Sequence, residues 1–181
     1  MPSPGDIEYR LLAAAEVDRI DEIDRAEVID GRYLLSDAAL VLDAEHHFVA
    51  RGWASGEPDG NKQRIRQCLA RGGVAWGAFA SDRPVGIAVL DGRRIGSDLA
   101  TLDMYFLHVS DGYRHSGIGQ ALVTLVSERA REMGARRLYV SSTPSANSVR
   151  FNQRRGFELA SEVDPELFGL EPDDIHMDTL L

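Results

Sequence analysis

The spacing of hydrophobic and polar side chains changes several times along the chain, and each change predicts a new element. Ile7–Ala13 alternates with the period of a β-strand. Ala14–Glu27 instead carries apolar residues at Val17, Ile20 and Ile23 with acidic residues between them, which is the spacing of an amphipathic helix. The pattern therefore predicts a strand followed by a helix.

The next segment is less regular. Residues 33–54 fit neither period well, so both a strand and irregular structure stay open for them. A second helix is expected to run to Ala70, with Asp59 or Asn61 as its N-cap and Gly72-Gly73 at its end.

The rest of the chain has clearer boundaries. A long helix with a strong apolar stripe is expected at Ile118–Met133, and a short helix is expected between Ser145, a good N-cap, and Gly156. Further strands are expected at Val74–Ala80, Arg83–Leu90, Leu99–Val109, Arg137–Ser142, Phe157–Val163 and Asp174–Leu180, with turns at Ser81-Asp82 and Asp91-Gly92. This order predicts one α/β domain, residues 1–181, built on a mixed and mostly antiparallel sheet.

The charge of the chain is unevenly distributed. The net charge is −9, and residues 1–60 hold 14 Asp and Glu against 5 Arg, whereas the remaining residues are balanced. An acidic balance argues against nonspecific nucleic-acid binding, which requires a basic face. It would suit a cationic amine partner, although the acids of Glu16–Asp30 can also be a solvated helix face.

Composition excludes several other classes of protein. No apolar run approaches the ~20 residues needed to cross a bilayer, so no membrane role is expected. The first ten residues lack the features of a secretory signal, and Cys68 is the single cysteine, so we expect a cytoplasmic protein. The five histidines do not show a metal-ligand spacing, and no metal site is expected.

The segment Tyr113–Gly119 (YRHSGIG) carries the clearest chemistry. It follows a predicted strand and opens a long helix, where unpaired backbone N–H groups and the helix dipole favour a phosphate. Gly117 and Gly119 permit a close approach of the backbone, and Arg114 adds positive charge. The pattern is neither a Walker loop nor a dinucleotide fingerprint, and by itself a glycine-rich turn before a helix is the alternative.

Two motifs together resemble the GNAT superfamily of acyl-CoA N-acetyltransferases. The first is Leu107–Val109 followed by YRHSGIGQALV, which looks like that family's coenzyme-binding motif. The second is TPSANSVRFNQRRGF (Thr143–Phe157), similar to its second signature, and the tail EPDDIHMDTLL resembles the last strand of many members. The resemblance implies a single GNAT-like domain with a seven-stranded sheet, helices on both faces, and acetyl-CoA as the acyl donor.

The resemblance also implies which residues hold the coenzyme. Backbone groups of Leu107, His108 and Val109 would pair with the pantetheine arm, on a strand that splays from its neighbour. The residues expected around the pyrophosphate are Arg114, His115, Ser116, Gly117, Ile118, Gly119 and Gln120. Ser145 and Asn147 fall where the family often makes a polar contact with the coenzyme, and Ser145 can equally be a helix cap alone.

The reaction implied is direct attack of an amine on the thioester. The N–H of Val109 would stabilise the oxyanion, and Asp103 would act as general base. If the strand is regular, Asp103 shares a face with Val109, and His108 points to the opposite face. His108 is a second candidate base, and Glu27 is a third because this region often contacts the substrate in the family.

One position departs from the family pattern. Many members have a tyrosine as general acid where this chain has Asn152, and an amide can only donate a hydrogen bond to the sulfur. The thiolate would then leave unprotonated, be protonated by water, or use another group such as Tyr105 or Tyr139. Asn152 also supports an alternative function, an acyl-CoA sensor with weak or no catalysis.

The acceptor itself is not specified by the sequence. A primary amine of a small molecule or peptide is expected, and the acidic first third would suit a cationic one. A nucleotide-binding regulator is a third hypothesis, and the resemblance also allows a homodimer.

Overall fold

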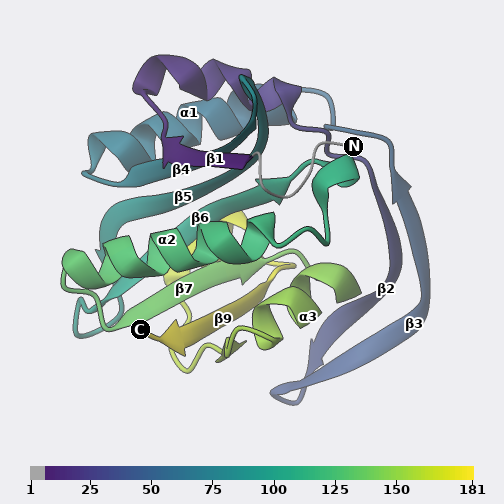
Figure 1. Cartoon of the computed structure of the whole chain (residues 1–181). Coiled ribbons are helices and arrows are strands. Elements are labelled where there is room, and N and C mark those ends of the chain that lie inside the picture. The colour runs from purple at the N-terminus through teal and green to yellow at the C-terminus, as the bar shows by residue number, and fades with distance from the viewer. Residues whose placement is uncertain (1–6) are drawn as a thin grey trace.

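The computed structural model describes residues 7–181, and its centre is one seven-stranded sheet (Figure 1). The strand order is β1-β4-β5-β6-β7-β9-β8, and every neighbouring pair is antiparallel except β6 and β7. The strands are β1 (Ile7–Leu11), β4 (Val74–Ala80), β5 (Arg83–Ile95), β6 (Thr101–Val109), β7 (Arg137–Ser142), β8 (Glu158–Leu159) and β9 (Ile175–Leu180). The predicted α/β class and the seven-stranded, mostly antiparallel sheet are confirmed. The predicted domain spans residues 1–181. Residues 1–6, which include the start of the segment that lacks the features of a secretory signal, lie outside the described residues.

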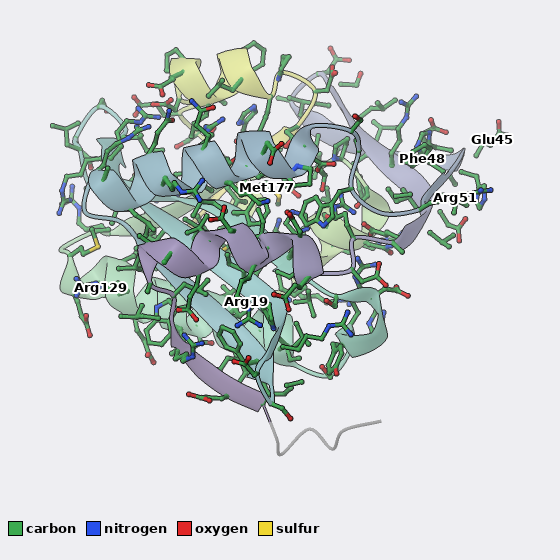
Figure 2. The ribbon with its side chains drawn as sticks, turned by 90° about the horizontal axis from the view of Figure 1, so that it is seen from above. Arg19, Glu45, Phe48, Arg51, Arg129 and Met177 are labelled. Atoms are coloured by element: carbon green, nitrogen blue, oxygen red, sulfur yellow. The ribbon has the colours of Figure 1, made fainter. Side chains whose placement is uncertain are left out.

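Helices cover both faces of this sheet, as predicted. The 3-10 helix η2 (Ala14–Glu22) and α1 (Glu57–Ala70) bury Val17, Ile20 and Ile65 against one face, and α4 (Pro165–Leu170) lies on the same side (Figure 2). The opposite face is covered by α2 (Ile118–Glu132) and α3 (Ala146–Gln153) (Figure 1). The first of these faces is called the α1 face below, and the second is called the α2 face.

The predicted helix Ala14–Glu27 is too long. The helical turns end at Glu22, and Glu27 is already the first residue of strand β2. The turn between them is tied to another part of the chain, because the N–H of Asp24 donates to Ser110 Oγ at 3.0 Å and the N–H of Asp111 donates to Asp24 O at 3.1 Å. These tertiary bonds compete with a further helical turn.

The ambiguous segment 33–54 belongs to a long β-hairpin. Strands β2 (Glu27–Ser36) and β3 (Ala39–Ala50) form a separate two-stranded sheet, joined by a two-residue turn in which Asp37 and Ala38 both have positive φ. An isolated bridge between Arg32 and Ser145 connects β2 to the start of α3. The hairpin projects beside the main sheet, with Phe48 on its outer part (Figure 2). Because neither of its faces is covered along its whole length, its sequence lacks a clean alternation, and Phe48 is 54% exposed.

Several predicted boundaries also need correction. Helix α1 begins at Glu57 after Gly56, not after Asp59 or Asn61. The predicted turn Asp91-Gly92 lies inside β5, where the pairing with β6 is irregular. The strand predicted from Leu99 begins only at Thr101, and Leu99 has a positive φ. The strand predicted at Phe157–Val163 is only Glu158–Leu159, and a helix that was not predicted, α4, follows it.

Candidate functional site

The site is built around a fork between the two parallel strands. β6 and β7 pair only from Thr101–Asp103 to Arg137–Tyr139, and beyond that point they have no register with each other. A cavity of about 490 Å³ opens there, lined by Met104–Val109 of β6 and Val140–Thr143 around the end of β7. The splay that the resemblance implied is therefore present.

A β-bulge at Tyr105 decides which side chains of β6 face which layer. Phe106 pairs with Val89 and Met104 pairs with Leu90, so Tyr105 is an extra residue between them. Met104 packs into the core under α2, whereas Phe106 packs into the core under α1.

The bulge corrects the expectation for Asp103. Because the strand is not regular, Asp103 lies on the α1 face together with Phe106 and His108, while Val109 lies on the α2 face. Asp103 is 3% exposed, its Oδ1 has no hydrogen-bond partner among the described residues, and it is not part of the described cavity wall. Burial raises the pKa of Asp103 to about 8, with the charge of Asp91 acting in the same direction.

His108 does line the cavity, but its surroundings keep it neutral. Its ring packs edge-on against Phe106 and Trp53, with centroids 4.4 and 5.2 Å away. Loss of solvation lowers the pKa of His108 to about 3, and the charges of Arg25 and Arg114 act in the same direction. An imidazole with this pKa is a weak proton acceptor.

The predicted phosphate cradle has the expected backbone. After the short helix η3 (Asp111–Tyr113), His115 and Gly117 adopt positive φ values of 62° and 89°, and α2 then begins at Ile118. The N–H of Arg114 donates to Asp111 O and that of Ala121 to Gly117 O, whereas the N–H groups of residues 115–120 have no backbone acceptor in the described chain. A run of unpaired N–H groups at a helix start fits a diphosphate.

Side chains around the cradle play different parts. Of the predicted residues, Arg114, His115 and Gly119 line the cavity. Ile118 is a core residue, and the Ser116 hydroxyl donates to Tyr113 O. Ser116, Gly117, Ile118 and Gln120 are absent from the described cavity wall. A Cβ on Gly119 would lie 3.1 Å from the Phe151 ring, so glycine leaves the room required between α2 and α3.

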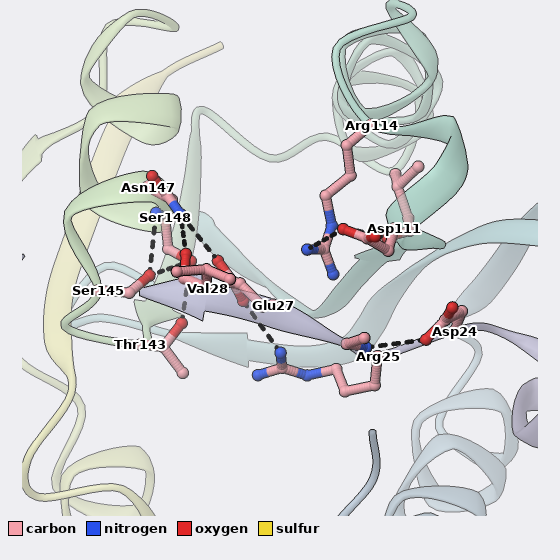
Figure 3. Close-up of polar contacts among 12 residues, drawn as sticks. Asp24, Arg25, Glu27, Val28, Asp111, Arg114, Thr143, Ser145, Asn147 and Ser148 are labelled. Atoms are coloured by element: carbon pink, nitrogen blue, oxygen red, sulfur yellow. Dashed lines mark hydrogen bonds and ion pairs between the residues drawn. The ribbon is translucent and has the colours of Figure 1, made fainter. Parts of the chain in front are cut away.

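The end of β6 presents one backbone group to the fork. Ser110 N–H donates to Val85 O on β5, so alternation along the strand turns the N–H and C=O of Val109 away from β5 and toward the opening. The C=O accepts a hydrogen bond from Arg114 Nε at 3.1 Å, and Arg114 also pairs with Asp111 (Figure 3). Arg114 is thereby held beside the strand end.

The opposite wall comes from α3. Ser145 is the N-cap that the sequence predicted, its Oγ accepting from Ser148 N–H at 3.2 Å, and it is 5% exposed and absent from the described cavity wall. Asn152 is buried, lines the cavity and donates to Ser142 Oγ at 3.1 Å.

Glu27 lines the cavity from the hairpin, not from a helix. It pairs with Arg25 at 3.0 Å and accepts from Asn147 Nδ2 at 3.2 Å, and the same amide donates to Val28 O (Figure 3). Asn147 therefore joins α3 to β2, although it also borders the cavity.

The α1 side of the cavity holds residues that sequence reasoning missed, beside Tyr105, which it had considered as an acid. Glu57 and Asn61 of α1, Tyr105 of the bulge, and Glu171 and Asp174 before β9 all line it. Tyr105 donates to Asn61 Oδ1 at 3.1 Å. The Glu-Pro-Asp-Asp sequence at residues 171–174 indicates a turn. No local pattern in it shows that this turn folds against β6. Tyr139, the other tyrosine considered as an acid, is 1% exposed and bonded to His176.

The acids of the first third are largely engaged elsewhere. Asp18 and Asp21 of η2 pair with Arg66 and Lys62 of α1, at 2.6 and 2.5 Å. These ion pairs tie the two helices together at the surface, and none of the four residues lines the cavity.

Comparison with known proteins decides the family. Residues 39–157 match the model of the Acetyltransferase (GNAT) family. The chain belongs to this family. No curated protein matches the sequence significantly.

Solved GNAT structures share the fold at low sequence identity. Nourseothricin acetyltransferase is 18% identical with a TM-score of 0.71, over 97% of this chain and 98% of that one. A putative streptothricin acetyltransferase from Bacillus anthracis, solved with acetyl coenzyme A, is 16% identical with a TM-score of 0.69, over 97% and 96%. PaiA N-acetyltransferase from Thermoplasma acidophilum, solved with coenzyme A, is 15% identical with a TM-score of 0.62, over 97% and 99%.

Two further features of residues 7–181 concern membranes and metals. None of their helices is long and apolar enough to span a bilayer. No group of His, Cys, Asp and Glu side chains among them has a metal-binding arrangement.

Proposed function

We propose that this GNAT protein transfers the acetyl group of acetyl-CoA to a primary amine of a small molecule or peptide that carries positive charge. The observation that carries the proposal is the fork, which opens to a cradle of unpaired N–H groups on the α2 face and to carboxylates on the α1 face. A donor with a diphosphate and an acceptor with an ammonium group would suit these two faces.

The residues of the chain would divide the work as follows. Acetyl-CoA would supply the electrophilic thioester carbonyl. Backbone groups of Leu107–Val109 would hold the pantetheine arm, and the N–H of Val109, turned toward the opening, would donate to the developing oxyanion. The N–H groups of residues 115–120 would bind the pyrophosphate, with Arg114 adjacent.

A second function, an acyl-CoA sensor without turnover, is favoured by Asn152. Its amide is already bonded to Ser142, and it cannot serve as a general acid. Isothermal titration with acetyl-CoA, combined with thiol release over a polyamine, an aminoglycoside and a lysine peptide, separates the two. Binding with turnover supports the enzyme, binding without turnover supports the sensor, and absence of binding overturns both.

A further inference from the structure

Two carboxylates line the fork on its α1 face and have no part in the proposed donor site. Glu171 and Asp174 are the first and last residues of a turn closed by Asp174 N–H to Glu171 O at 3.2 Å, with Pro172 as its second residue. Such a turn brings its end residues within about 7 Å of each other. Both side chains line the cavity, whereas Asp173 between them is exposed.

Glu171 lies over the point where the strands separate. Its charge acts on Asp103, in the last paired position of β6, and on Tyr105 of the bulge. Ser141, which stands two residues beyond the last paired position of β7, lowers the pKa of Glu171 and lines the same cavity. Glu171 therefore lies at the opening on the α1 face.

Asp174 lies further along the opening. It precedes Ile175, which pairs with Ser142 of β7. Ser142, Leu107 and Asp174 all line the same cavity. Asp174 thus shares the cavity with the backbone that would hold the reacting end of the donor, and lies on the face left free for the acceptor.

We propose that Asp174 takes the proton of the acceptor amine and that Glu171 holds the ammonium group beside it. The assignment rests on the proposed function and adds to it the residues that select and activate the acceptor. Glu57, which borders the same space from α1, would favour an acceptor with a second positive charge. The substrate class is then a diamine or a longer polycation.

The charges around the pair fit this division. Burial raises the pKa of Asp174 to about 7, and the charges of Glu171 and Asp173 act in the same direction. Burial also raises the pKa of Glu171, but Arg64 and the Ser141 hydroxyl oppose that shift and favour its ionised form. The titratable or charged groups around the pair are Glu57 and Arg64 of α1, Asp103 and Tyr105 of β6, Asp173 of the turn and His176 of β9.

Protons and electrons balance in the proposed step. The ammonium gives one proton to the Asp174 carboxylate, which later passes it to solvent through the open cavity. The free amine nitrogen forms the C–N bond at the thioester carbonyl, and the C–S bond then breaks with its electron pair leaving with sulfur. The nitrogen releases a second proton to solvent, and the thiolate takes up one proton from solvent to become the thiol.

The test compares Asp174→Asn, Glu171→Gln and the matched control Asp173→Asn on the amine that the wild-type protein acetylates fastest. A positioned base contributes about 100-fold or more, so Asp174→Asn should lower kcat/KM at neutral pH by at least that factor. Its deficit should shrink as the pH approaches the pKa of the amine, because free amine then needs no base. Glu171→Gln should raise the KM of the amine about tenfold with a smaller effect on kcat.

The affinity for acetyl-CoA, measured by titration, should stay unchanged in all three variants, and Asp173→Asn should lower the rate far less than Asp174→Asn, because Asp173 does not line the cavity and only its charge acts on Asp174. Wild-type kinetics in Asp174→Asn and Glu171→Gln would overturn the assignment while leaving the proposed function intact. Loss of activity in Asp103→Asn alone, with the same change of pH profile, would assign the base to Asp103 instead. If the wild-type protein binds acetyl-CoA and acetylates no amine, the proposed function itself fails, and the assignment fails with it.

Discussion

Replacing Asp103 by asparagine should make the free energy of unfolding less sensitive to rising pH. The carboxyl group is 3% exposed, and its Oδ1 has no hydrogen-bond partner among residues 7–181. Its pKa is raised from 3.8 to about 8 by burial, so the folded protein holds this proton through neutral pH. Asparagine keeps the shape of the side chain and removes the titration.

The sign and the size of the effect follow from proton linkage. Between the pKa of the unfolded chain, near 3.8, and that of the folded protein, near 8, the folded state binds one proton more than the unfolded state. Stability therefore falls as pH rises through this window and levels off above it. One pKa unit corresponds to about 1.4 kcal/mol, so the wild-type protein should lose about 4 kcal/mol relative to the variant between about pH 4 and pH 7.

Urea unfolding of the two proteins at several pH values measures this difference. The unpaired amide of the variant costs some stability at every pH, but that cost cancels when the change with pH is compared. Other titrating groups cancel for the same reason. Parallel curves of unfolding free energy against pH would refute the idea that Asp103 is buried as an uncompensated acid.

Three further variants or reagents test other parts of the structure. Gly119→Val should weaken acetyl-CoA binding at least tenfold, because the branched side chain enters the space beside Phe151; titration checks this, and unchanged affinity would contradict the cradle. Ser145→Ala should lower the unfolding free energy by about 1 kcal/mol through loss of the cap on Ser148 N–H, with coenzyme affinity unchanged; a large loss of affinity would instead show a direct contact. Cys68 is buried and burial raises its pKa to about 12, so iodoacetamide should label it only after unfolding, and rapid labelling of the native protein would contradict its placement.

Local features of the sequence were sufficient for the fold class and the cradle. The segment proposed to bind the pyrophosphate is contiguous, and its backbone follows from its own glycines and from the helix that begins after them. The helix cap is likewise local, because the hydrogen bond from Ser148 N–H to Ser145 Oγ joins residues three positions apart. Strands of the main sheet were predicted because helices cover both of its faces, so its central strands are short apolar runs bounded by turns.

The hairpin of β2 and β3 shows where such reasoning stops. Its strands lie beside the sheet with partly exposed faces, so no burial constraint imposes a period on their sequence. Glu27 was predicted on a helix because the sequence does not show the bonds that end the helix. These bonds join Asp24 to Ser110 and Asp111, which lie far away in the chain.

The chemistry of the acceptor side was decided by the tertiary structure. A single bulged residue, Tyr105, moves Asp103 to the face opposite Val109, and a bulge depends on the partner strand as much as on the sequence that carries it. Glu171 and Asp174 reach the fork only because β9 pairs with β7 and returns the preceding turn to β6. The sequence alone thus predicted a contiguous segment for the proposed donor site, whereas the charged groups of the proposed acceptor site come from distant segments whose proximity only folding creates.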